Sequence, residues 1–170
     1  LSSNDVLVRE ASVSCLGRLA LLSGESIVME KYKSLLLSIL SKANEKVEIR
    51  AQAMLALSDL TLLYEGTLRP IEVEGRRLDL IEFVTQMLQH ENPSVIAVAS
   101  EVAIKLLFSG KVQDLELVAS LVVIFFNKNY EDYDEDEDVH EVGSIYRMQQ
   151  LLSLFFPSYV IKGHDLTQVI

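Results

Sequence analysis

Apolar residues recur every three or four positions along most of the chain, as they do on the buried face of a helix. The segment 26–42 is the clearest case, because Met29, Tyr32, Leu36 and Leu40 share one face. The pattern predicts seven helices and the start of an eighth, at residues 5–22, 26–42, 47–64, 77–89, 94–108, 115–127 and 142–156, and from 163 onward.

Turn-forming residues separate these helices. Gly24 and Gly110 each follow an apolar stretch and predict a helix end, whereas Pro93 suits the first position of a helix. The segment 67–76 has no helical periodicity and predicts a long inter-helix loop with room for a brief extended segment. Pro157 predicts the end of the helix that starts at residue 142.

A short phrase recurs along the chain at a spacing of about 40 to 50 residues. It reads Val8-Arg9 with Ser12 and Leu16, and then Ile49-Arg50 with Ala53 and Leu57. Such a period is typical of stacked helical hairpins of the HEAT or armadillo type, which serve as binding surfaces more often than as enzymes. We therefore expect an all-α HEAT-repeat α-solenoid of about eight helices, with residues 1–170 forming a single fragment of a longer chain.

Composition agrees with a folded helical domain. The 170 residues are 49% hydrophobic and 24% charged, with only seven glycines and three prolines to punctuate a β-rich fold. One cysteine, Cys15, cannot form an internal disulfide, which favours a reducing intracellular compartment, and its apolar neighbours predict a buried side chain. The longest uncharged stretch, 148–161, is too short to span a membrane.

The net charge of −10 is concentrated in one segment. Residues 131–141 contain eight acidic residues and no Lys or Arg; without these eight of the 25 acids, the rest has 17 acids against 15 bases. We expect 130–141 to be an acidic, mobile loop, and the alternative is that it repels DNA from one face or competes for the basic groove. A nearly neutral body can still carry a basic stripe.

Four sequence blocks resemble the C-terminal HEAT region of condensin complex subunit 3, the G-type non-SMC subunit. They occur in the family's order and cover nearly the whole chain. The blocks are Val8-Arg9-Glu10 with Cys15-Leu16-Gly17 and Leu21-Leu22; Asp59-Leu60 through Leu62-Leu63 to Gly66; Glu101 to Leu107 with Ser109-Gly110-Lys111; and Phe126-Asn127 with Gln150, Leu152-Ser153, Phe155-Phe156-Pro157 and Tyr159.

The resemblance implies a non-catalytic subunit that acts in mitotic chromosome condensation, in the nucleus and on chromosomes, with the cytoplasm possible outside mitosis. A curved HEAT solenoid of this family is expected to bind the kleisin subunit and to grip duplex DNA without sequence specificity, while the SMC-type subunits hydrolyse ATP. Overall acidity keeps an alternative open: a HEAT or armadillo scaffold, such as a transport or adaptor module, that binds only protein.

Five basic residues are candidates for contact with DNA phosphates: Arg69, Arg76, Arg77, Lys105 and Lys111. For each, ordinary surface charge or a cation near a helix C-terminus is an alternative, and the Lys105 stem can also lie along the core. Three further arginines recur at equivalent repeat positions, where an ion pair within the repeat or a hydrogen bond to a loop is favoured over DNA: Arg9, Arg50 and Arg147.

No pattern in the sequence predicts a catalytic, cofactor or metal site. His90, His140 and His164 are far apart and show no His-Glu-x-x-His spacing. The acidic segment 131–138 lacks the glycine and the spacing of a calcium loop, and the chain contains neither a phosphate-binding Gly-x4-Gly-Lys loop nor a Gly-x-Ser-x-Gly elbow.

Overall fold

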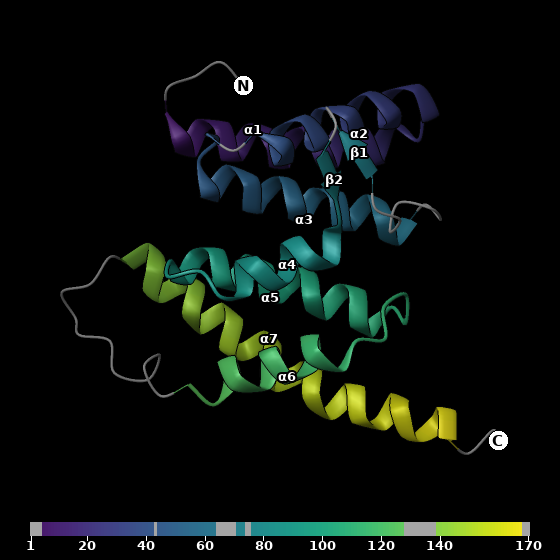
Figure 1. Ribbon diagram of the computed structural model, residues 1–170, viewed down its shortest axis with the longest axis vertical. Helices are drawn as coiled ribbons and strands as arrows, with labels where there is room; N and C mark the ends of the chain where they lie inside the picture. The colour runs from purple at the N-terminus through teal and green to yellow at the C-terminus, as the bar shows by residue number, and fades with distance from the viewer. Residues whose placement is uncertain (1–4, 43, 64–70, 74–75, 128–138, 168–170) are drawn as a thin grey trace.

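The computed structural model describes residues 5–42, 44–63, 71–73, 76–127 and 139–167. In this part of the chain, seven helices and one short β-hairpin follow one another (Figure 1). Their bounds are α1 Val6–Ser23, α2 Ser26–Ser41, α3 Val47–Leu63, β1 Ile71–Val73, β2 Arg76–Leu78, α4 Leu80–Leu88, α5 Pro93–Phe108, α6 Leu115–Phe125 and α7 Val139–Thr167.

The helices form two layers. Helices α1, α3, α5 and α7 contact one another in that order and make one layer, which we call the inner layer. Helices α2, α4 and α6 pack against it and make the outer layer, as Figure 1 shows from the top to the bottom of the stack. This stacking of helical hairpins confirms the predicted all-α, HEAT-like solenoid.

The core lies between the two layers and is almost entirely aliphatic. Each helix pair contributes fully buried side chains, which include Leu36, Leu40, Ile49, Met54, Leu57, Leu106, Leu107, Leu117, Leu121, Met148 and Leu152. Burial of these side chains is the main force that holds the stack together, because each is worth roughly 1.5–3 kcal/mol when removed from water. None of the described helices combines the length and apolarity that a membrane crossing requires.

The prediction for the face of α1 was partly wrong. Cys15 is exposed, although its apolar neighbours predicted a buried side chain, and the neighbouring Leu16 and Leu19 are exposed as well. The residues that α1 buries against α2 and α3 are small, namely Val13, Gly17 and Ala20. Their short side chains let the Tyr32 ring of α2 approach the α1 backbone, and this close approach decides which face turns inward.

The loop between α3 and α4 contains more regular structure than the sequence predicted. Residues 71–73 and 76–78 pair as an antiparallel hairpin in which Val73 lies opposite Arg76. Helix α4 therefore begins at Leu80 and not at residue 77. Asp79 fixes this start, because its carboxylate accepts hydrogen bonds from the amides of Ile81 and Glu82.

The end of the chain is one helix where two were predicted. Helix α7 continues through Pro157 to Thr167, and in Figure 1 its yellow end runs at an angle to its green beginning. A proline inside a helix costs about 3 kcal/mol. Aromatic packing on both sides offsets this cost, because Phe155 and Tyr159 contact each other and Phe156 contacts Phe125 of α6.

Helix α7 also begins three residues earlier than predicted, at Val139, within the segment expected to be loop. The acidic residues 131–138 lie outside the described part of the chain.

Candidate partner-binding groove

Two adjoining cavities hollow the surface of the inner layer. Their volumes are about 200 and 440 Å³, and both open to solvent. They share five lining residues from all four inner helices: Glu10 of α1, Gln52 of α3, Val98 and Glu101 of α5, and Arg147 of α7. We call the continuous depression that they form the inner groove.

Short side chains create the inner groove. Each inner helix presents at least one small residue to it, and these residues are Ala11, Ser14 and Gly17 of α1, Ala51 and Ala56 of α3, Ser94 and Ala97 of α5, and Ser144 of α7. Small residues at corresponding turns of successive helices leave a channel whose floor is close to the backbone. Such a floor suits a ligand whose backbone or small side chains can lie against it.

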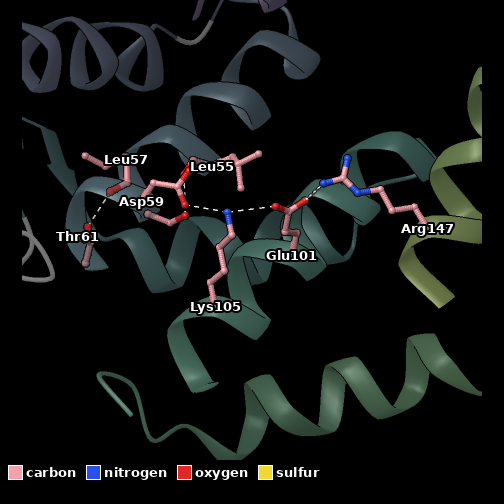
Figure 2. A network of polar contacts seen from close by, with 8 residues as sticks. Leu55, Leu57, Asp59, Thr61, Glu101, Lys105 and Arg147 are labelled. Carbon is pink, nitrogen blue, oxygen red and sulfur yellow. Dashed lines mark hydrogen bonds and ion pairs between the residues drawn. The ribbon is translucent and has the colours of Figure 1, made fainter. Parts of the chain in front are cut away.

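Four charged residues form a chain of ion pairs along the inner groove (Figure 2). Lys105 Nζ lies 2.7 Å from Asp59 Oδ1 on α3 and 3.1 Å from Glu101 Oε1 on its own helix. Arg147 Nη2 of α7 lies 2.5 Å from the other carboxylate oxygen, Glu101 Oε2. We call this arrangement the charge ladder, and it connects α3, α5 and α7.

The charge ladder raises the pKa of Lys105. Burial alone would lower the pKa of Lys105, but the hydrogen bond to Asp59 and the nearby carboxylate of Glu101 raise it above its usual value. The sequence predicted Lys105 as a DNA-contact candidate, and its ammonium group instead lies between two carboxylates of the fold.

Lys111 also makes a contact within the stack. Its Nζ donates a 2.7 Å hydrogen bond to the Thr61 carbonyl oxygen, near the C-terminal end of α3. Lys162 of α7 makes the corresponding contact one repeat further along the stack. Its Nζ donates a hydrogen bond to the Phe108 carbonyl oxygen at the end of α5 and lies 5.0 Å from the Phe108 ring centroid. Each lysine thus pairs with a carbonyl oxygen in the last turn of an inner helix, where cations are favoured.

The three repeat arginines have three different partners. Arg9 forms an ion pair with Glu45, which precedes α3, whereas Arg147 belongs to the charge ladder. Arg50 lies over the Phe83 ring of α4, with its guanidinium carbon 4.7 Å from the ring centroid. Burial lowers the pKa of Arg50 from its ordinary value.

The other DNA-contact candidates lie in the connection between α3 and α4. Arg76 and Arg77 belong to strand β2, and Arg69 lies outside the described residues.

The ladder carboxylates were not predicted from the sequence. A usable signal was present, because Asp59 and Lys105 are 46 residues apart and Glu101 and Arg147 are also 46 apart. A repeat period of this size places one residue above the other on successive inner helices. Within the described part of the chain, no group of three or more His, Cys, Asp or Glu side chains could hold a metal ion.

The fold and the inner groove define the class of this protein as a helical-repeat scaffold. The chain belongs to the family of nuclear condensing complex subunits, whose C-terminal domain model matches residues 1–169. This agrees with the family that the four sequence blocks resemble. The family is one of non-catalytic condensin subunits, and membership supports a condensin role for the chain in general terms. No curated protein and no solved structure matches the chain.

Proposed function

We propose that the inner groove binds an extended segment of the kleisin subunit and that the chain thereby acts as a non-catalytic arm of condensin in mitotic chromosome condensation. The observation that supports this proposal is the groove's continuity across all four inner helices. A globular partner needs a matching convex surface, whereas an extended segment can follow a channel from one repeat to the next.

The polar groups of the inner groove suit peptide recognition. Gln52 offers both a hydrogen-bond donor and an acceptor close to the floor made by Ala51 and Ala56. The charge ladder balances its own charges, with two carboxylates and two cations. A nearly neutral groove favours a peptide over the phosphate backbone of DNA, which requires an excess of cationic side chains.

Duplex DNA is proposed to bind elsewhere on the same arm. We assign this contact to Arg69, Arg76 and Arg77, which lie in the connection between α3 and α4. Lys105 and Lys111 are less suited to this role, because a phosphate would have to replace their existing contacts with Asp59 and with the Thr61 carbonyl. Binding through arginine and phosphate is insensitive to sequence and weakens as salt rises.

The groove proposal is tested with fluorescently labelled segments that together cover the kleisin subunit. Ala97→Trp places a large side chain in the inner groove at a partly exposed position of α5. Ala119→Trp makes the same change at an exposed position of the outer helix α6 and is the control. Fluorescence anisotropy is expected to show at least a tenfold weaker affinity for Ala97→Trp, about 1.4 kcal/mol, and no change for Ala119→Trp. Equal affinities for both variants would exclude the groove as the binding site.

The DNA proposal is tested by gel shift of the chain together with the kleisin subunit, at about 0.1 M and 0.2 M salt. We expect Arg76→Glu with Arg77→Glu to abolish the shifted band and the wild-type band to weaken at the higher salt. The control is Lys42→Glu with Lys46→Glu, which makes the same change in charge at exposed positions between α2 and α3.

A protein-binding scaffold without DNA binding is the alternative, and the net charge of −10 favours it. It predicts that kleisin or another peptide binds the inner groove while charge reversal at Arg76 and Arg77 has no effect. The two experiments together separate these functions, because the first reports on the groove alone and the second on DNA alone.

A further inference from the structure

The charge ladder is a run of linked ion pairs that joins three helices, and it lies on the side of the stack that faces the inner groove. One pair, Asp59 with Lys105, joins α3 to α5. The other pair, Glu101 with Arg147, joins α5 to α7 (Figure 2). Fully buried apolar side chains of the same helices lie in the core and line neither cavity, as Leu106 of α5 and Leu152 of α7 do.

The helices of the inner layer are thus joined by different kinds of contact on their two sides. The core side of each helix pair is held by apolar burial, which salt does not weaken. On the groove side, attraction between charges adds to the contacts between the helices, and salt screens this attraction. Removing the attraction on one side only would let the helices rotate about the core contacts and would widen the groove, while the core stays intact.

We propose that the charge ladder sets the curvature of the inner layer, so that the inner groove is narrow at low ionic strength and widens as ionic strength rises. The proposal concerns the shape of the chain itself and does not depend on which partner occupies the groove.

The two helix junctions are expected to respond to salt at different concentrations, because the ladder residues differ in exposure. The central carboxylate, Glu101, has a side chain that is 16% exposed, whereas that of Arg147 is 66% exposed. Exposed ion pairs contribute little and are readily screened, and shielded ones persist. The α5–α7 junction is therefore expected to open at lower salt than the α3–α5 junction, where Lys105 is only 30% exposed.

The distance between α1 and α7 reports the opening. Cys15 is the chain's only cysteine, and it is exposed on α1, beside the groove residue Ser14. Gln150 is exposed on α7, one turn from Arg147, so that Gln150→Cys provides a second labelling site. Spin labels on the two thiols allow the distance distribution to be measured by double electron–electron resonance in the 170-residue chain.

The measurement is made at about 0.1 M and about 1 M KCl, between which the Debye length falls from about 10 to 3 Å. For the doubly labelled chain with the ladder intact, the mean distance is expected to increase with salt. Glu101→Gln keeps the shape of the central residue but removes its charge. It is expected to release the α5–α7 junction already at 0.1 M, so that the distance there exceeds that of the intact ladder, and to show a smaller further increase with salt, because the Asp59–Lys105 pair remains.

Glu48→Gln is the matched control, because Glu48 lines the same groove and takes part in none of the ladder's ion pairs. It should respond to salt as the chain with the intact ladder does. Far-ultraviolet circular dichroism confirms that each variant is folded, and Lys105→Met tests the ladder a second time if Glu101→Gln fails to fold. The proposal is wrong if salt leaves the distance unchanged, or if both glutamine variants respond as the intact chain does.

Discussion

Replacement of Gly17 by alanine tests the close contact between α1 and α2. A Cβ atom at this position would lie 2.6 Å from the Tyr32 hydroxyl oxygen and 3.3 Å from the ring carbon that carries it. Tyr32 has little room to move, because it is buried and its hydroxyl donates a 2.8 Å hydrogen bond to the Val13 carbonyl. The added methyl group therefore displaces the ring and breaks this hydrogen bond.

The magnitude follows from three opposing effects. Alanine in place of glycine inside a helix stabilises by up to about 1 kcal/mol. Overpacking costs about 1–3 kcal/mol and loss of the Tyr32 hydrogen bond costs about 1 kcal/mol. Gly17→Ala is thus expected to lower the free energy of unfolding by about 1–3 kcal/mol. The sign is the informative result, because helix propensity alone predicts the opposite one.

Urea denaturation of a double-mutant cycle separates these effects. Tyr32→Phe removes the hydroxyl, which is the closest atom, so that Gly17→Ala should cost close to nothing when it is added to the phenylalanine variant. The reasoning would be refuted if Gly17→Ala cost the same in both backgrounds, or if it stabilised the wild-type chain.

Three further predictions concern other parts of the stack. Burial alone would raise the pKa of Glu45, but the hydrogen bond from Arg9 lowers this pKa overall. The ionised carboxylate therefore stabilises the fold at pH values above the pKa that Glu45 has in the unfolded chain. This stabilisation is lost as the pH falls through the lower pKa of the folded state. Glu45→Gln should therefore flatten the acid limb of a plot of melting temperature against pH, and an unchanged limb would contradict this. Leu106→Ala, at a fully buried position, should lower the free energy of unfolding in urea by about 2–5 kcal/mol, and a loss below about 1 kcal/mol would mean that the site is not packed as described. Lys111→Met should cost about 0.5–1.5 kcal/mol by removing the hydrogen bond to the Thr61 carbonyl, and no loss in the same assay would exclude a stabilising role.

Hydrophobic periodicity predicted the helices well where packing on both sides agreed with it. The bounds of α2, α3 and α5 differ from the prediction by at most one residue, and Gly24 ends α1 with a φ of 64°, as expected of a helix C-terminus. Periodicity failed where local and tertiary effects compete. Pro157 predicts a helix end, and only the aromatic contacts made by Phe156 and Tyr159 explain why α7 continues.

The candidate site was less predictable than the fold. A list of basic residues does not show which of them already have partners, and the positions of Lys105 beside Asp59 and of Lys111 beside the Thr61 carbonyl follow from the stacking of distant helices. The groove itself depends on small residues such as Ala97, which the sequence alone does not distinguish from ordinary helix formers. The repeat period is the one sequence feature that relates these residues to one another.

Site-specific photo-crosslinking from the groove tests the central claim most directly. A photoreactive amino acid replaces Gln52, which is partly exposed on α3 and lines both cavities, and the chain is irradiated together with the kleisin subunit. The control carries the same amino acid in place of Ala119 on the outer layer. The account predicts a covalent product with the kleisin subunit from position 52 and none from position 119. A product from position 119 alone, or equal products from both, would contradict binding in the inner groove.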